Sequence, residues 1–143
     1  SGTGVCGANI RNNINIDTMK KLLLLAVTAL FAISLNAGEY PDISIKELKS
    51  LIAAKKVTVI DVMGAKSYKL GHVPTAISFN RNLAKALPKD KDALIVAYCG
   101  GPSCKAYKRA AGLAEKLGYT NVKHMSAGIS GWKKAGGKLE KAN

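Results

Sequence analysis

The sequence predicts an α/β domain built around a mainly parallel sheet. Two observations indicate this class: segments with apolar residues at helical spacing alternate along the chain with short, continuously apolar segments rich in β-branched residues. A continuously apolar strand is typical of a parallel sheet, because helices cover both of its faces. The 143 residues suffice for one small domain.

Helices are predicted where apolar residues recur at helical spacing beside a capping or stop signal. Ser44 and Glu47 form a capping box for the first helix. Asn80 caps the third helix, Pro88 stops it, and Gly118 closes the fourth. The predicted helices cover residues 44–54, 66–70, 80–87, 105–117 and a short segment around Trp132 that ends at 136–137.

Strands are predicted where short runs are apolar and β-branched, without helical spacing. The run at 94–98 is apolar throughout, which favours a central, fully buried strand. The predicted strands cover residues 57–62, 76–79, 94–98 and 121–125.

Residues 1–37 are not expected to belong to this fold. Met19-Lys20-Lys21 precedes an apolar run from Leu22 to Leu35, and Ala37 follows as a small residue suited to cleavage. This layout is typical of a secretory signal peptide over residues 19–37. The run is shorter than the roughly 20 apolar residues of a membrane span. A retained membrane anchor and a buried N-terminal helix remain the alternatives.

Residues 1–18, upstream of that methionine, are polar and have no hydrophobic period, so we do not expect them to form a domain. The domain is then expected over residues 38–143. If the leader is cleaved, the protein is exported and periplasmic, and it is membrane-anchored only if the leader is retained.

The composition is strongly basic. Lys and Arg total 22 against 9 Asp and Glu, which gives a net charge of +13 and favours anionic partners. The lysines are scattered, with no aromatic stacking platform between them, so a nucleic-acid partner is not expected. The 3 cysteines are too few for a disulfide framework.

A glycine-rich segment, here called the cysteine loop, follows the strand predicted at 94–98. It consists of Cys99, Gly100, Gly101, Pro102, Ser103, Cys104 and Lys105. Ligand sites in parallel sheets form at the carboxyl ends of strands. The glycines let the backbone curl around the Cys99 thiol, and the following helix and Lys105 add positive charge. We therefore expect a lowered pKa and a nucleophilic thiolate at Cys99.

The same loop is predicted to bind an anion beside the Cys99 sulfur. Pro102 has no N–H, which leaves as expected donors the backbone amides of Gly100, Gly101, Ser103, Cys104 and Lys105. The alternative is that Cys99 is only a small buried apolar residue at the end of a strand.

The sequence resembles the rhodanese family along nearly the whole predicted domain. Asp61-Val62-Met63 with Tyr68 to Ala76 is similar to the first rhodanese signature. Tyr98 to Cys104, then Leu117-Gly118-Tyr119 and Gly128 to Trp132, are similar to the catalytic loop and the carboxyl-terminal signature.

This resemblance implies a three-layer sandwich in which helices flank a sheet of about five strands. It also implies a sulfurtransferase that carries sulfane sulfur as a persulfide on Cys99, with no other cofactor. The sulfur would come from a small anionic donor such as thiosulfate or a polysulfide. It would pass to cyanide, a thiol or a protein partner. Met63 and the Cys104-Lys105 pair stand where the family usually has arginine, and lysine lacks arginine's bidentate fork.

Cys104 has two interpretations. It could be a resolving thiol that attacks the Cys99 persulfide or closes a disulfide, which requires a Cα–Cα distance below about 7 Å. Otherwise it packs beneath the loop or at the start of the next helix.

Asp61 and His72 are expected to support the site through hydrogen bonds to backbone. A catalytic acid, a general base or a metal ligand among them is the less favoured alternative. A zinc site built from Cys99, Cys104, His72 and His124 is not expected, because the cysteine spacing is unusual for a ligand pair.

Three classes of function follow. The favoured class is a sulfurtransferase enzyme. The second is a non-enzymatic sulfur carrier or dithiol redox module that uses Cys99 and Cys104. The third is a phosphatase, because Cys99 and Lys105 have the spacing of the cysteine and arginine in a phosphate loop. Lys105 is a poor substitute for the arginine clamp of that chemistry.

Overall fold

The structure is a computed structural model that describes residues 39–143. The predicted upstream region and signal peptide therefore lie outside the described residues. No helix within residues 39–143 has both the length and the apolar character needed to cross a membrane.

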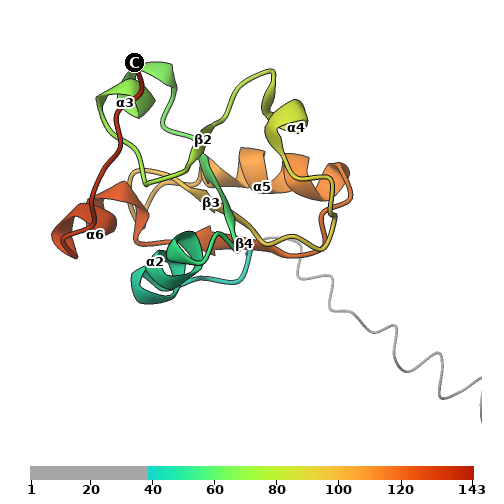
Figure 1. Cartoon of the computed structure of the whole chain (residues 1–143), viewed down its shortest axis with the longest axis horizontal. Coiled ribbons are helices and arrows are strands. Elements are labelled where there is room, and N and C mark those ends of the chain that lie inside the picture. Colours follow the sequence, from blue (N-terminus) through green and yellow to red (C-terminus); the bar gives the residue numbers. More distant parts are fainter. Residues whose placement is uncertain (1–38) are drawn as a thin grey trace, which may run out of the picture. The chain divides into compact units, whose positions relative to one another are not determined.

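A parallel sheet forms the centre of the domain (Figure 1). Its 4 strands lie in the order β2-β1-β3-β4, and each neighbouring pair is parallel. The strands are β1 (Thr58–Asp61), β2 (Ile77–Ser78), β3 (Ile95–Tyr98) and β4 (Val122–Met125). All four therefore form where the sequence predicts strands.

The expected fifth strand is reduced to a single bridge. Asp42 pairs in parallel with His124 at the outer edge of β4. The amide of Ile43 donates to the carbonyl of His124 at 2.9 Å, and the amide of His124 donates to Pro41 at 2.9 Å. Ser44 caps a helix immediately afterwards, so the pairing ends there.

Helices cover both faces of the sheet, which confirms three layers (Figure 1). Apolar residues of α2 and α6 pack in the cluster on one face, and those of α4 and α5 pack in the cluster on the other. The helices are α2 (Ile45–Ala53), α3 (Ala65–Leu70), α4 (Leu83–Ala86), α5 (Tyr107–Lys116) and α6 (Gly128–Lys134).

The alternation of side chains along β3 decides to which face of the sheet Cys99 points. Ile95 and Ala97 belong to the cluster under α4 and α5, whereas Val96 and Tyr98 belong to the cluster under α2 and α6. Cys99 continues the first set and packs in the cluster under α4 and α5. The sheet therefore directs Cys99 and Tyr98 to opposite faces at its carboxyl edge.

Two helix predictions are wrong at their starts. Asn80 does not cap α4; its Oδ1 accepts the amide of Asn82 at 2.8 Å, and this local turn delays the helix to Leu83. The helix predicted from Lys105 begins at Tyr107 instead. Ser44 does cap α2, accepting the amide of Glu47 at 3.1 Å.

Candidate functional site

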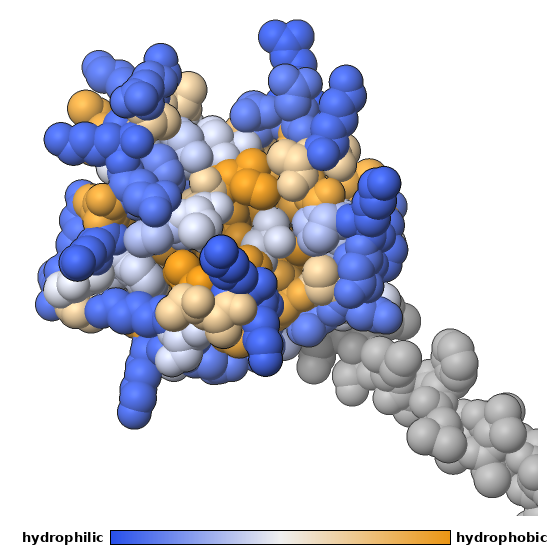
Figure 2. Space-filling model, viewed as in Figure 1, coloured by the Kyte–Doolittle hydropathy of each residue, from blue (hydrophilic) through white to orange (hydrophobic). Residues whose placement is uncertain are grey.

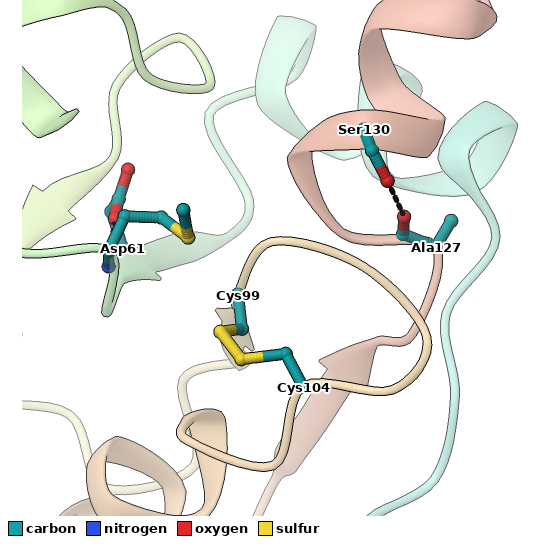
Figure 3. The surroundings of a disulfide bond; sticks show 6 residues. Asp61, Cys99, Cys104, Ala127 and Ser130 are labelled. Atoms are coloured by element: carbon teal, nitrogen blue, oxygen red, sulfur yellow. Dashed lines mark hydrogen bonds between the residues drawn. A yellow bond between two sulfur atoms is a disulfide. The ribbon is translucent and has the colours of Figure 1, made fainter.

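The two cysteines of the cysteine loop form a disulfide (Figure 3). Their Cα atoms are 6.0 Å apart, within the range that a disulfide spans. Cys99 is buried, with 4% of its surface exposed, whereas Cys104 is partly exposed. Both cysteine side chains also pack in the apolar cluster under α5. Cys104 is therefore disulfide-bonded and packed against the core at the same time.

The start of α6 holds the backbone of the loop. The amide of Ile129 donates to the carbonyl of Cys99 at 2.9 Å, and the amide of Ser130 donates to the carbonyl of Gly100 at 3.0 Å. Gly128 has a φ of 61°, and a Cβ there would lie 2.5 Å from the amide nitrogen of Gly101. The two segments touch so closely that only glycine fits at Gly128.

The loop keeps most of its predicted anion donors available. Within residues 39–143, no protein acceptor pairs with the amides of Gly100, Gly101, Ser103 and Lys105. Cys104 is the exception, because its amide donates to the carbonyl of Gly101 at 3.0 Å. This amide was wrongly predicted as a free donor, although Pro102, at the second position of the turn from Gly101 to Cys104, is a sequence signal for that turn.

Asp61 is fully buried at the end of β1, beside the loop in Figure 3. Its carboxylate accepts the amide of Met63 at 2.6 Å and the hydroxyl of Tyr98. The Tyr98 oxygen in turn accepts the amide of Val73 at 3.0 Å. These contacts join β1, β3 and the turn before β2. The Asp61 carboxylate is therefore engaged by one backbone amide and one phenol hydroxyl.

Tyr98 is a site residue that the sequence reasoning missed. Burial and the hydrogen bond to Asp61 raise the pKa of its phenol, so it is a neutral donor. The signal was present, because a polar atom at the end of an apolar strand needs a partner and Asp61 ends the adjacent strand.

His72 lies in the turn before β2. Its Nδ1 lies 2.8 Å from the carbonyl of Tyr68, its ring stacks on the Tyr68 ring, and its Nε2 lies 3.9 Å from the Glu140 carboxylate. Within the described residues, the polar contacts of the His72 side chain are with Tyr68 and Glu140 only. The backbone of His72 also forms a bridge with that of Glu140. His72 thus stabilises the turn and the C-terminal segment.

A pocket of about 250 Å³ opens on the side of the loop that carries Cys104. Its lining includes Cys104, Lys105, Lys108 and His124. The His124 ring is stacked on Tyr107, with 3.3 Å between centroids. Burial lowers the pKa of His124 below its ordinary 6.5, against the opposing effect of Asp42. The sequence gives no signal for this pocket, because its walls come from separate segments.

Figure 2 shows that hydrophilic side chains project from one face of the domain, with apolar atoms visible between them. Lys105 is exposed and Lys108 is half-buried in α5. Both lysines line the pocket, together with the carboxylates of Glu39 and Asp42, so the charges on this side of the loop are mixed.

Comparisons with known proteins agree with this architecture. The profile of the rhodanese-like domain matches residues 44–135. A thiosulfate sulfurtransferase, GlpE, of Shewanella oneidensis is 29% identical over 102 residues, which cover 68% of this chain and 97% of that protein. An HTH-type transcriptional regulator of Mycobacterium tuberculosis is 34% identical over 116 residues, covering 78% of this chain but only 50% of the regulator.

Solved structures show the same fold. The BH2092 protein from Bacillus halodurans superposes with a TM-score of 0.62 at 28% identity, covering 89% of this chain and 87% of that one. The human single-domain sulfurtransferase TSTD1 superposes with a TM-score of 0.54 at 24% identity, covering 66% of this chain and 96% of that one.

Proposed function

Because the chain belongs to the rhodanese-like domain family, we propose that it is a sulfurtransferase that carries sulfane sulfur as a persulfide on Cys99. One observation carries the proposal: Cys99 directly follows β3 and begins a loop in which α6 amides hold the carbonyls of Cys99 and Gly100, while most of the loop's own amides have no partner within residues 39–143. Such a loop can stabilise negative charge on a cysteine sulfur and on a small anion beside it.

The reaction begins from the reduced loop. The Cys99 thiolate attacks the outer sulfur of thiosulfate, the S–S bond of the donor breaks, and sulfite leaves with the bonding electron pair. The persulfide then forms on Cys99. A thiophilic acceptor such as cyanide or a thiol attacks its terminal sulfur, and the Cys99 thiolate is regenerated as the leaving group.

The loop amides supply the stabilisation that both steps need. The donor, the persulfide and the thiolate are all anionic, and free N–H groups in a curled loop bind anions. The net charge of +13 favours the approach of an anionic donor. A protein acceptor and an exported location are part of the same proposal, with export depending on residues 19–37.

The test is the intact mass of the reduced Cys104→Ser variant before and after thiosulfate, because this variant isolates the chemistry of Cys99 from that of the second cysteine. We expect a gain of one sulfur atom on the peptide that contains Cys99, and removal of that atom by cyanide as thiocyanate. Cys99→Ser should abolish the gain while the domain stays folded. Thiocyanate formation at the wild-type rate by Cys99→Ser would exclude this mechanism.

The disulfide favours a second candidate, a dithiol redox module that does not transfer sulfur. Such a module would cycle between the Cys99–Cys104 disulfide and two thiols without acquiring sulfur from a donor. The same mass measurement separates the two functions, because only the sulfurtransferase gains a sulfur atom.

A further inference from the structure

We propose that Cys104 is a resolving thiol that turns the Cys99 persulfide into free sulfide and a disulfide. This step rests on the proposed persulfide at Cys99 and adds a second activity to it. The chain would then act as a sulfide-releasing reductase of sulfane sulfur, driven by a dithiol, and not only as a donor to acceptors.

The first argument is the position of the two sulfurs. Cys99 and Cys104 are bonded in the structure, with their Cα atoms 6.0 Å apart (Figure 3). The backbone is fixed at both ends of this pair: α6 amides hold the carbonyls of Cys99 and Gly100, and the Cys104 amide is bonded to Gly101. The Cys104 thiol therefore stays within reach of the inner persulfide sulfur, which gives it a high effective concentration.

The chemistry balances without an added oxidant. The Cys104 sulfur attacks the inner sulfur of the Cys99 persulfide, and a bond forms between the two cysteine sulfurs. The bond to the outer sulfur breaks, and that sulfur leaves with the electron pair and the Cys104 proton as hydrosulfide. The sulfane sulfur is reduced, and the two cysteines are oxidised to the disulfide that the structure contains.

The second argument is the asymmetry of exposure, which decides how the disulfide is reduced. Cys99 is 4% exposed and is absent from the pocket lining, whereas Cys104 is partly exposed and lines the 250 Å³ pocket with Lys105 and Lys108. A dithiol reductant therefore reaches the Cys104 sulfur first.

The leaving group in that attack is the Cys99 thiolate, which the loop amides can stabilise. The second thiol of the reductant then displaces Cys104, which takes up a proton, and the reductant leaves as a disulfide. The reduced loop is ready for another sulfane donor. Each cycle thus consumes one dithiol and one sulfane sulfur and releases one sulfide.

The first experiment is a single turnover of the full chain, reduced and then freed of reductant, with excess thiosulfate. Wild type should release about one sulfide per chain and finish as the Cys99–Cys104 disulfide, without added sulfur. Cys104→Ser should keep the persulfide and release sulfide only after dithiothreitol is added. Cys6→Ser, which removes the third cysteine, should behave like wild type.

The outcomes separate this inference from the proposed function. A stable persulfide on wild type, with no sulfide released, overturns the role of Cys104 and leaves the sulfurtransferase intact. A folded Cys104→Ser protein that gains no sulfur overturns the proposed function itself. Sulfide release by Cys104→Ser at the wild-type rate also overturns the inference.

A second experiment tests the direction of reduction. The disulfide form is treated with limiting glutathione, free thiols are alkylated at once, and the peptides are mapped by mass. We expect glutathione on Cys104 and the alkyl group on Cys99, because only Cys104 lines the pocket. Glutathione attached mainly to Cys99 would overturn the assignment of Cys104 as the attacked sulfur.

Discussion

The contact between Tyr98 and Asp61 is the main buried polar interaction beside the cysteine loop. Both residues are 0% exposed, and the phenol both donates to the carboxylate and accepts the amide of Val73. A buried carboxylate is costly unless donors surround it. Tyr98 therefore stabilises the end of β3, from which Cys99 extends.

Tyr98→Phe should lower the free energy of unfolding by about 2–3 kcal/mol, because it leaves one buried carboxylate oxygen of Asp61 and the buried amide of Val73 without their hydrogen-bond partner. Urea unfolding measures the change. Tyr119→Phe is the matched control: its hydroxyl donates to a neutral carbonyl, that of Pro88, and its loss should cost about 1 kcal/mol. Equal losses in the two variants would contradict this account.

His124 makes the stability of the domain sensitive to acid. Burial holds its pKa below the ordinary 6.5, so in the folded state it resists protonation that the unfolded chain accepts. The unfolded state then binds more protons below pH 6.5, and the free energy of unfolding falls as the pH falls.

His124→Phe, which keeps a ring against Tyr107, should reduce this loss of stability between about pH 7 and about pH 5. The measurement is urea unfolding of both proteins across that range. An unchanged pH dependence in the variant would show that His124 titrates alike in the folded and unfolded states.

At the scale of elements, the start of α6 and the cysteine loop form one unit. Gly128 permits the close approach, and two amides of α6 hold two carbonyls of the loop. The helix thus acts on the site through its backbone, although none of its side chains needs to contact the sulfur.

Gly128→Ala should therefore affect both stability and chemistry. The positive φ costs about 1 kcal/mol or more in any L-residue. The added Cβ would also displace Gly101 and slow sulfur loading of Cys99 by at least about tenfold. Gly136→Ala has a similar φ of 66° but meets nothing within 4 Å. That control should lose stability but keep its rate of sulfur loading. Slow loading in both variants would show that the contact with Gly101 is not the cause of the slowing.

The sequence predicted the presence and order of these elements better than their starts. Continuous apolar runs identified β1 and β3, because burial on both faces leaves few alternatives. The start of α5 was wrong because Cys104 and Lys105 remain in the loop, where Cys104 is paired with Cys99 and its amide turns back to the carbonyl of Gly101. Such tertiary constraints do not appear in helical periodicity.

At the scale of the whole molecule, the charge of +13 acts on any anion that approaches. Sulfur loading from thiosulfate should slow by a few-fold between low and high ionic strength, because salt screens this attraction. Dimethyl trisulfide, a neutral sulfane donor, should show little dependence. Loading is followed by the intact mass of Cys104→Ser against time, and equal salt dependence for both donors would exclude steering by charge.

The parts of the site differ in how far the sequence could predict them. Cys99 and its glycine-rich loop were recognisable because they are contiguous and follow an apolar strand. The role of His124 was not, since its partner Tyr107 comes from a distant segment. The sequence signal for Tyr98 was usable only once its strand was placed beside the strand that ends at Asp61. Long-range pairing of this kind follows from the three-dimensional arrangement and not from spacing along the chain.

The dependence of the cysteine loop on α6 has a consequence for biosynthesis. A ribosome completes Cys99 and Cys104 before it adds Ile129 and Ser130, whose amides hold the loop. During that interval the nascent chain carries both thiols without their anchors. Cys99 therefore acquires its final surroundings only when nearly all of the domain has been synthesised, and a chain truncated after β4 keeps the thiols but lacks the anchored loop.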